Sequence, residues 1–472
     1  MSGYDGRPVL VAGAGVAGRA SALALLELGA DVTVIDRSDS PALAALRDAG
    51  AAVLVGDVPD AALLDRVNEV MVSPGFAPTH PLVVAATKAG CEIYSEPELA
   101  WRLRRPGLSG QLPRWLAVTG TNGKTTVVTM LAAILATAGL RTAALGNVGE
   151  PLVDAVLRTP EAQYDVIAVE LSSFQLHWSS TLAPQAGALL NLADDHLDWH
   201  GDFDAYAGAK ADIWRAADGV AVGNLDDPRV AGLLAKAPGR RIGYTLGEPE
   251  PGQLGVSGWA PGGPAGDAML TDWAFGDGPV SLMPVADLKL AGSHNVANAL
   301  AAAALARAYG VPPEAVRDGL AGYRPQPHRN APVGTVAGVT YVDDSKATNP
   351  HAAYGSLTAY PRVVWVAGGQ LKGVDIDPLV AAVADKLVGV VLIGIDRARI
   401  ADALRRHAPR VPVTDVARTD DGAMAEAVAV ATALAGPGDT VLLAPAAASF
   451  DMFTGYAERG DRFAAAVAAL PR

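Results

Sequence analysis

Short apolar runs alternate with Ala- and Leu-rich stretches through the first part of the chain. The runs have the length of buried strands and lie at Val9–Val11, Val32–Ile35, Ala52–Val55 and Glu69–Val72. The stretches between them have a helical composition. This alternation predicts βαβα units, and therefore a parallel sheet covered by helices.

The same rhythm returns in two further blocks. The second block has predicted strands at Trp115–Thr119, Val166–Glu170 and Gly187–Leu192 and a helix at Ser293–Tyr309. The third begins near Arg329 and has predicted strands at Thr340–Val342, Val363–Val366, Val390–Ile393 and Thr440–Leu443. The Pro- and Gly-rich segments Arg102–Pro113 and Gly247–Asp267 predict a linker and an irregular loop. The 472 residues suffice for about three domains, which we place at 1–103, 104–325 and 326–472.

Composition and charge narrow the class of protein. Half of the residues are hydrophobic, so large buried cores are possible. The net charge of −13 disfavours nucleic-acid binding, because a phosphate backbone attracts a basic surface. No unbroken apolar window is long enough for a membrane helix, and Met1–Pro8 lacks the features of a signal peptide. Cys91 is the single cysteine, which fits a reducing cytoplasm. We expect a cytoplasmic protein that binds neither nucleic acid nor membranes.

The sharpest local motif follows the strand at Trp115–Thr119. It reads Gly120-Thr121-Asn122-Gly123-Lys124-Thr125-Thr126, and a helix is predicted to begin near Lys124. A glycine-rich turn between a strand and a helix directs backbone N–H groups at an anion. Lys124 would add positive charge for phosphates, and Thr125 a hydroxyl for Mg²⁺. The alternative is a tight turn that opens an ordinary helix.

A second glycine-rich turn, Gly13–Gly18, follows the first strand, and Asp36 ends the second. The pattern GxGxxG with an acid about 20 residues later is typical of dinucleotide-binding domains. Any nucleotide with a pyrophosphate and a ribose could use such a turn. The alternative is that small residues are needed there for helix–strand packing.

Acidic and histidine side chains follow two strands of the second block. Glu170 ends one strand and could hold Mg²⁺ beside Thr125, although a solvated strand-end acid is the alternative. The segment Asp194–His200 follows the next strand and mixes Asp with His, as a second metal site would. Its alternative is a helix N-cap with a surface histidine.

Taken together, these motifs resemble those of the Mur ligases and folylpolyglutamate synthetases. The matching segments are Thr119–Thr126, Glu170–Leu176, Asp195–Asp198, Ala209–Lys210 and His294–Asn298. Asp343–Asn349 and Ser449–Phe453 resemble the Mur ligases that add D-glutamate. The resemblance implies an α/β fold of three domains: a Rossmann-like N-terminal domain that binds UDP, a P-loop ATPase-like central domain and a Rossmann-like C-terminal domain.

The resemblance also implies roles for residues around ATP. The loop residues 120–126 would hold the phosphates. Thr125 and Glu170 would bind one Mg²⁺. His196 would bind a second Mg²⁺ with the help of a carbamate on Lys210. The catalytic residues would be Lys124, His196 and Lys210. The remaining ATP contacts would come from Asn295, Asn298, Arg329 and Asp344.

Substrate contacts follow from the same resemblance. The UDP end would meet Gly15, Val16, Ala17, Asp36, Arg37, Ser73 and Gly75. The muramoyl-alanine would lie near Asn147 and Ser172. The carboxylates of D-glutamate would meet residues of the third block, namely Lys346, Thr348, Lys372, Ser449, Phe450 and Tyr456.

The activity so implied is ATP-driven addition of D-glutamate to UDP-N-acetylmuramoyl-L-alanine through an acyl phosphate, by a monomer. Three rivals remain. A dehydrogenase would explain Gly13–Gly18 but not Lys124 or Glu170. A P-loop switch protein would bind nucleotide without forming an amide. A sibling ligase, which adds another amino acid or adds glutamates to folate, is disfavoured by Asp343–Asn349.

Overall fold

The computed structural model describes residues 3–259 and 266–471. They divide into two compact units, one made of 3–259, 266–285 and 297–322 and the other of 286–296 and 323–471. Each unit is described by itself. No helix among the described residues is both long and apolar enough to cross a bilayer.

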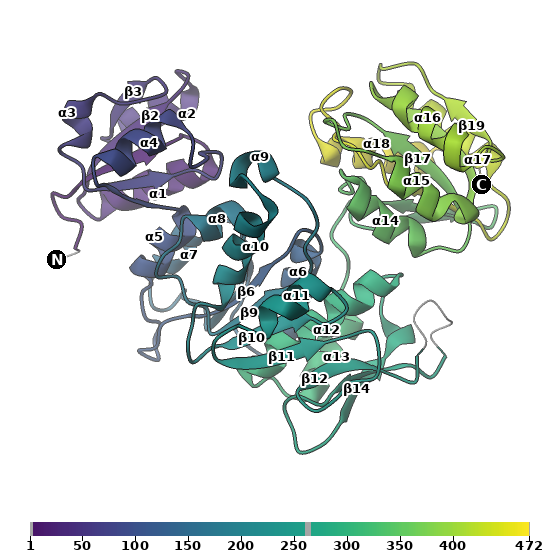
Figure 1. The fold of residues 1–472 in the computed structure, drawn as a ribbon, viewed down its shortest axis with the longest axis horizontal. Coiled ribbons are helices and arrows are strands. Elements are labelled where there is room, and N and C mark those ends of the chain that lie inside the picture. Colours follow the sequence, from purple (N-terminus) through teal and green to yellow (C-terminus); the bar gives the residue numbers. More distant parts are fainter. Residues whose placement is uncertain (1–2, 260–265, 472) are drawn as a thin grey trace. The chain divides into compact units, whose positions relative to one another are not determined.

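The N-terminal sheet is parallel, with the strand order β3-β2-β1-β4-β5 (Figure 1). Its strands are β1 (Pro8–Ala12), β2 (Asp31–Asp36), β3 (Ala52–Val55), β4 (Glu69–Val72) and β5 (Glu92–Tyr94). Its helices are α1 (Val16–Glu27), α2 (Pro41–Asp48), α3 (Ala61–Leu64), α4 (Pro81–Lys88) and α5 (Glu96–Leu103). Alternate residues of β1 enter two different cores, Val9 and Val11 one, Leu10 and Ala12 the other, because successive side chains point to opposite faces.

The central sheet has the order β14-β13-β12-β11-β10-β9-β6-β8-β7, parallel except for the pairs β12–β13 and β13–β14. Its strands are β6 (Arg114–Thr119), β7 (Ala144–Gly146), β8 (Val166–Glu170), β9 (Ala186–Leu189), β10 (Val220–Asn224), β11 (Arg240–Tyr244), β12 (Gln253–Ser257), β13 (Met269–Asp272) and β14 (Val280–Pro284). Its helices are α6 (Lys124–Thr137), α7 (Leu152–Val156), α8 (Ser173–His177), α9 (Leu197–His200), α10 (Phe203–Ala211), η1 (Asp212–Trp214), α11 (Pro228–Leu234), η2 (Val285–Asp287), α12 (Ser293–Tyr309) and α13 (Pro313–Gly322).

The prediction of an irregular loop or insert over Gly247–Asp267 is wrong for residues 253–257 and holds for 247–252, which form no helix or strand. Residues 253–257 form β12, which pairs with both β11 and β13. Glycine-rich sequence hid the strand, because Gly252 and Gly258 at its two ends have positive φ angles of 89° and 73° and serve as turns. Residues 260–265 of the predicted loop lie outside the described residues.

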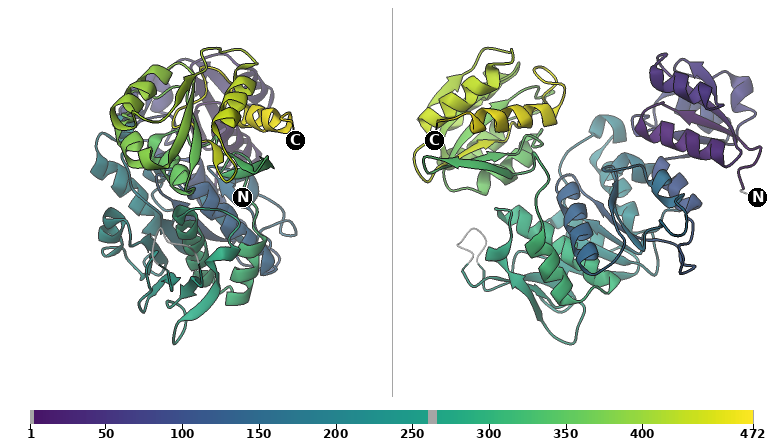
Figure 2. Two further views of the ribbon diagram at one scale, coloured as in Figure 1. Left: turned by 90° about the vertical axis from the view of Figure 1, so that its right-hand side faces the viewer. Right: turned by 180° about the vertical axis from the view of Figure 1, so that it is seen from behind.

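The C-terminal sheet has the order β15-β16-β20-β17-β18-β19, with only β15 antiparallel among the described strands. The strands are β15 (Ala331–Val336), β16 (Val339–Asp343), β17 (Val363–Gly368), β18 (Leu387–Ile393), β19 (Val413–Asp415) and β20 (Thr440–Leu443). The helices are α14 (Pro350–Thr358), α15 (Asp377–Val383), η3 (Ala384–Lys386), α16 (Arg397–His407), α17 (Ala423–Leu434) and α18 (Tyr456–Ala468). Helices cover both faces of this sheet (Figure 2). Each face therefore has its own core: Trp365 of β17 packs in one, and Val364 and Val366 pack in the other.

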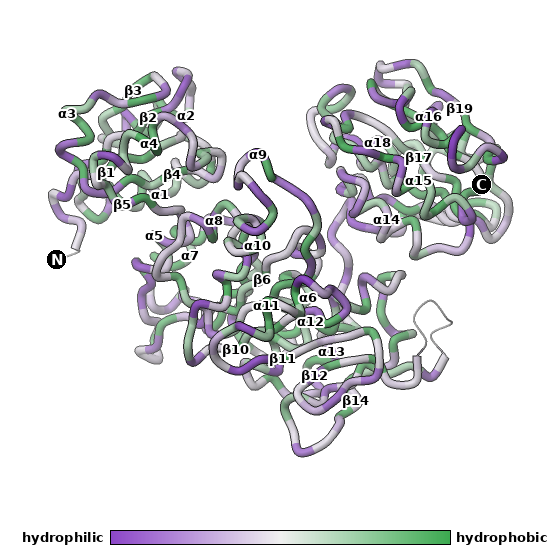
Figure 3. Tube along the Cα trace, viewed as in Figure 1, coloured by the Kyte–Doolittle hydropathy of each residue, from purple (hydrophilic) through white to green (hydrophobic). Residues whose placement is uncertain are grey.

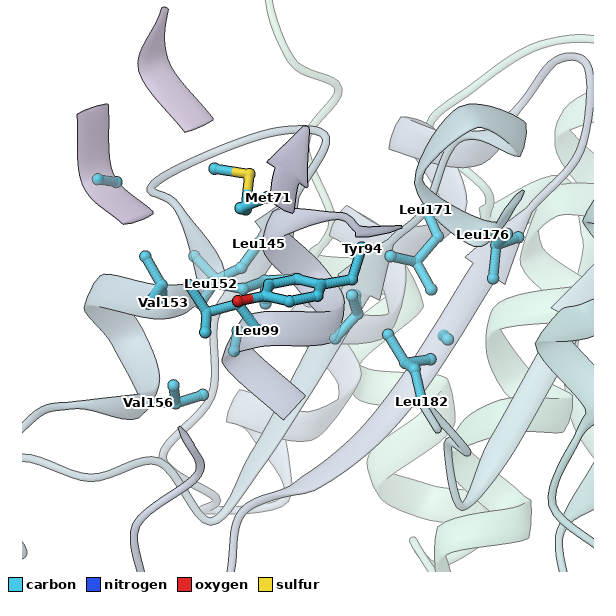
Figure 4. Packing of buried hydrophobic residues seen from close by; sticks show 14 of the residues in the cluster. Met71, Tyr94, Leu99, Leu145, Leu152, Val153, Val156, Leu171, Leu176 and Leu182 are labelled. Carbon is cyan, nitrogen blue, oxygen red and sulfur yellow. The ribbon is translucent and has the colours of Figure 1, made fainter. Parts of the chain in front are cut away.

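The N-terminal and central sheets share a core. Tyr94 of β5 lies in a buried cluster that contains residues of both blocks (Figure 4). Met71 and Leu99 come from the first block, and Leu152 and Leu182 come from the second. Hydrophobic positions recur along the helices and strands of each block (Figure 3). The shared apolar surface joins these two sheets into a single unit, since its exposure to water would be unfavourable.

A buried carboxylate reinforces this junction. Glu98 of α5 is fully buried and accepts hydrogen bonds from the backbone N–H groups of Ser180, Thr181 and Leu182 at 2.9–3.2 Å. Arg102 donates to the same carboxylate at 3.0 Å. Burial alone would raise the pKa of Glu98, but the hydrogen bonds from Thr181 and Arg102 lower it below its ordinary value.

We expect Glu98→Ala to lower the free energy of unfolding of this unit by about 3 kcal/mol, because Leu182 N–H and Arg102 lose a buried acceptor. Urea unfolding followed by tryptophan fluorescence measures the change. The matched control is Glu92→Ala, which removes the exposed second partner of Arg102 and should cost less than about 1 kcal/mol. Equal losses in the two variants would contradict the structural role of Glu98.

Candidate active site

The predicted phosphate loop lies between the end of β6 and the start of α6. Gly120 and Gly123 have φ angles of 155° and 83°, which favour glycine. A Cβ on Gly123 would lie 2.6 Å from Oδ1 of Asn298 on α12. The turn is therefore restricted to glycine by both conformation and space, and its N–H groups can approach an anion closely.

Two side chains from other segments hold this loop in place. Asn191 accepts from the N–H of Asn122 at 2.8 Å and donates to its carbonyl at 3.1 Å. The hydroxyl of Thr121 lies 2.8 Å from that of Tyr206 on α10. Sequence reasoning missed Asn191 and Tyr206. For Asn191 a signal existed, since it closely follows the end of β9 as Glu170 ends β8.

Two lysines converge on one backbone carbonyl. The amines of Lys124 and Lys210 donate to the Gly120 oxygen at 2.9 and 2.8 Å. Lys210 is 2% exposed and lies 4.8 Å from the ring centre of Tyr206. Burial, followed by the charge of Lys124, holds the pKa of Lys210 well below its ordinary value. The neutral form of the Lys210 amine is thereby favoured.

Glu170 meets Thr125, as predicted, and also Asn147, which the sequence had linked to the muramoyl-alanine instead. The Thr125 hydroxyl donates to one carboxylate oxygen at 2.6 Å, and the Asn147 amide donates to the other at 2.8 Å. Thr125 and Glu170 are 5% and 2% exposed. Parallel pairing of β6 with β8 brings these groups to the carboxyl edge of the sheet, where ligands of open α/β sheets bind.

His196 sits at the N-terminus of α9 with a φ of 55°. Its ring lies 4.6 Å from that of Phe174 and its Nε2 3.5 Å from Asp195. Burial lowers the pKa of His196, and Asp195 opposes the shift. Within the described residues, no group of three or more His, Cys, Asp or Glu side chains is placed to hold a metal. The segment Asp194–His200 therefore does not form a metal site from such side chains alone.

The other predicted residues of this unit have mainly local contacts. Ser172 caps α8 by accepting from Gln175 N–H, and the Gln175 side chain accepts from Ser172 N–H. The Thr126 carbonyl accepts from the Thr129 hydroxyl. Asn298 lies against the loop at Gly123. Asn295, which belongs to the other unit, donates to the Ala291 carbonyl at 2.7 Å.

In the C-terminal unit, the predicted residues follow the carboxyl ends of neighbouring strands. Asp344 follows β16 and accepts from Asn330 N–H at 3.0 Å and from the Ser356 hydroxyl. Burial raises the pKa of Asp344 to about 6, with Arg329 among the groups that oppose the shift.

The residues predicted for D-glutamate divide among the loops after β16, β17 and β20. The Lys346 amine lies 4.0 Å from the ring centre of Tyr456, and Thr348 N–H donates to the Lys346 carbonyl. Lys372 is exposed with a φ of 51°. Ser449 is buried, whereas Phe450 is 67% exposed.

Sequence reasoning missed two polar side chains that contact the segments carrying these loops. Arg459 of α18 is fully buried and donates to Ser345 and to the Ala447 carbonyl. His328 Nδ1 lies 2.6 Å from Asp343. Both join segments far apart in the chain, so no local pattern indicates them.

The N-terminal glycine-rich turn forms one wall of a pocket of about 240 Å³. Gly13 has a φ of 95°, and a Cβ there would lie 2.6 Å from the Ser73 hydroxyl. That hydroxyl is buried without a hydrogen-bond partner among the described residues. Asp36 accepts from Ala14 N–H at 2.7 Å and so orders the turn. The pocket is lined by Gly13, Ile35, Asp36, Arg37, Gly56, Asp57, Gly75, Phe76, His80 and Leu82.

The remaining predicted residues of the turn are less enclosed. Gly15 is the N-cap of α1, and a Cβ there would meet nothing within 4 Å. Val16 is 76% exposed. Ala17 follows it in the first turn of α1. Their predicted contacts with UDP stay predictions.

Comparison with known proteins agrees with this geometry in all three blocks. The family models that match are the Mur ligase MurD-like N-terminal domain over residues 7–95, the Mur ligase middle domain over 118–306 and the Mur ligase glutamate ligase domain over 328–447. A UDP-N-acetylmuramoylalanine–D-glutamate ligase of Thermobifida fusca is 52% identical, with 98% of this chain and 99% of the relative covered. That of Streptomyces coelicolor is 51% identical, with 99% of each covered.

The chain belongs to the Mur ligase family. Among solved structures, the UDP-N-acetylmuramate–alanine ligase MurC of Thermotoga maritima shares the fold with a TM-score of 0.59 and 19% identity, covering 98% of this chain and 99% of that one. The α/β fold of three domains is confirmed for this Mur ligase. The domain boundaries and the roles of the individual site residues stay predictions.

The buried carboxylate of Asp344 should make the stability of the C-terminal unit depend on pH. Between about pH 4 and 6 the folded state holds a proton that the unfolded state has released, so stability falls as pH rises. We expect Asp344→Asn to raise the free energy of unfolding by about 1–3 kcal/mol near pH 7.5, and by less near pH 4.5. Urea unfolding, monitored through the hydrogen exchange of peptides from residues 323–471, measures this free energy of unfolding. The control Asp385→Asn changes an exposed acid, and a pH-independent gain would contradict the prediction.

Proposed function

We propose that this chain is an ATP-dependent amide ligase that joins D-glutamate to UDP-N-acetylmuramoyl-L-alanine. The observation that carries the proposal is its identity of about half over full length to relatives named UDP-N-acetylmuramoylalanine–D-glutamate ligase. The convergence of Lys124, Thr125, Glu170 and Lys210 on one glycine-rich turn supplies the chemistry that such a reaction needs.

The loop at Gly120–Thr126 fits the phosphates of a nucleotide with magnesium. Its glycines leave no room for Cβ atoms, and Lys124 lies folded onto the loop carbonyls, where its amine can instead meet a phosphate. Thr125 and Glu170 present a hydroxyl and a carboxylate, which are oxygen ligands that Mg²⁺ accepts. When bound there, the ion would neutralise charge on the phosphates.

The reaction proceeds in two transfers. The alanyl carboxylate attacks the γ-phosphorus of ATP, the bond to the bridging oxygen breaks, and ADP leaves with an acyl phosphate formed. The amine of D-glutamate then attacks the acyl carbon, phosphate leaves, and the nitrogen loses a proton. The protein contributes position and charge: the loop N–H groups and Lys124 orient the γ-phosphate.

Lys210 fits a carbamate. Its amine is buried and donates to a neutral carbonyl, and the neutral amine is the form that attacks the carbon of CO₂ with loss of one proton. The product would turn an amine into an oxygen ligand beside His196, where a second Mg²⁺ is predicted. A ¹³C carbonyl signal from labelled bicarbonate, present in the wild type and also in Lys210→Arg, would contradict this assignment.

D-Glutamate brings two carboxylates to the C-terminal unit. Lys372 and Thr348 on one side and Ser449 on the other offer the ammonium and hydroxyl donors that carboxylates need. The roles of Lys346, Phe450 and Tyr456 here, and of Arg329, Asp344, Asn295 and Asn298 with ATP, are likewise proposals. The cytoplasmic location and the monomeric state stay predictions.

Amino-acid choice tests the activity. With UDP-N-acetylmuramoyl-L-alanine and ATP, ADP release should be about 100-fold faster with D-glutamate than with L-glutamate or D-aspartate, because a misplaced carboxylate leaves polar groups of the site unpaired. A coupled ADP assay with product mass spectrometry measures this. ADP release that ignores the muramoyl substrate, or a preference for another amino acid, would sink the proposal.

The Thr125 hydroxyl should matter for catalysis and little for folding. We expect Thr125→Val to lower kcat about 100-fold, because a magnesium ligand is lost while the shape is kept. Thr129→Val is the matched control, since Thr129 lies one turn further along α6 and its hydroxyl donates to the Thr125 and Thr126 carbonyls of the same helix at 2.7 and 3.1 Å. Its kcat should stay within about twofold of the wild type. Similar kcat values for both variants would remove Thr125 from the metal site.

A further inference from the structure

The pocket beside the N-terminal glycine-rich turn contains a histidine that the ligase reaction leaves without a role. His80 lies at the N-terminus of α4, and its Nδ1 accepts from Leu82 N–H at 3.2 Å. Its ring packs edge-on against Phe76, with ring centres 4.7 Å apart. Both rings line the pocket.

The N-cap fixes where the proton of His80 resides. A neutral imidazole accepts at one nitrogen and donates from the other, so acceptance at Nδ1 places the proton on Nε2. Burial, followed by the charge of Arg37, lowers the pKa of His80. The neutral ring is thereby favoured at neutral pH.

A guanidinium contact competes for the same nitrogen. Arg37 Nη2 lies 3.4 Å from His80 Nε2, at the outer limit of a hydrogen bond, and would require Nε2 to accept. The Leu82 N–H is fixed by the helix, whereas the Arg37 side chain is 73% exposed and is held at 2.7 Å by Asp57. The N-cap therefore favours the tautomer with the proton on Nε2, and Nε2–H can meet a ligand in the pocket once the exposed Arg37 side chain turns aside.

We infer that His80 reads the base of the UDP-linked substrate, donating its Nε2–H to a carbonyl oxygen of uracil while the Phe76 ring packs against the base. This rests on the proposed function, which supplies a uridine nucleotide. Uracil offers two carbonyl acceptors on a flat apolar ring. A pocket of about 240 Å³ with an aromatic wall, the neutral donor of His80, the guanidinium of Arg37 and the carboxylates of Asp36 and Asp57 matches that chemistry.

His80→Asn separates base reading from helix capping. Asparagine also accepts from the N-terminal N–H groups of a helix, so the melting temperature should stay within about 2 °C of the wild-type value. Asparagine lacks the imidazole Nε2–H. Calorimetric titration should show UDP binding weakened about tenfold, the loss of one hydrogen bond. The KM for UDP-N-acetylmuramoyl-L-alanine should rise similarly, with kcat within about twofold. His80→Ser, which caps through a hydroxyl, is measured beside it.

The outcomes distinguish the two levels of the proposal. If the wild type does not bind UDP, the proposed function fails. If the wild type binds UDP and both His80 variants bind it equally well, His80 is only a cap and the inference is overturned, while the proposed function stands. If binding of inorganic pyrophosphate weakens as much as that of UDP, His80 acts at the phosphates and base reading is again overturned. His407→Asn, on α16, is the control and should bind UDP as the wild type does.

Discussion

Two amines at one carbonyl oxygen set the electrostatics of the central domain. Lys124 and Lys210 both donate to Gly120, and the second of them is buried where an ammonium is costly. The neutral form of the Lys210 amine is therefore favoured, and Lys124 supplies the positive charge beside the loop. The chain as a whole carries a net charge of −13, so Lys124 and the loop N–H groups must attract a polyanion against the charge of the rest of the molecule.

Neutral hydrogen bonds hold the loop in place. Asn191 and Tyr206 hold Asn122 and Thr121 through uncharged hydrogen bonds, and Asn298 fills the space at Gly123. Because none of these groups neutralises the lysines, the loop keeps its shape and its charge together. Glu170 is held separately by Thr125 and Asn147, so its carboxylate is oriented as well as buried.

Local patterns in the sequence were enough to predict the strands that carry the phosphate loop and Glu170, because a buried strand is a run of apolar residues. They were also enough to predict the phosphate loop itself, because its residues are contiguous. They failed where structure depends on distant partners. Strand β12 was missed because the glycines at its two ends, Gly252 and Gly258, form turns and make the sequence resemble a loop. Asn191, Tyr206, Arg459 and His328 act on segments far along the chain, and no spacing rule connects them. In the segment Asp194–His200, adjacency along the chain did not bring three or more such side chains together among the described residues, and the second metal there stays a prediction.

The seam between the N-terminal and central sheets has a consequence for any attempt to divide the chain. Apolar packing around Tyr94 and the acceptor role of Glu98 tie residues of the first block to the segment 175–182 of the second. A fragment that ends after the first block would expose this apolar surface to water and would deprive Glu98 of the N–H donors of Thr181 and Leu182. The first block is thus a separate sheet in topology but not a self-sufficient folding body.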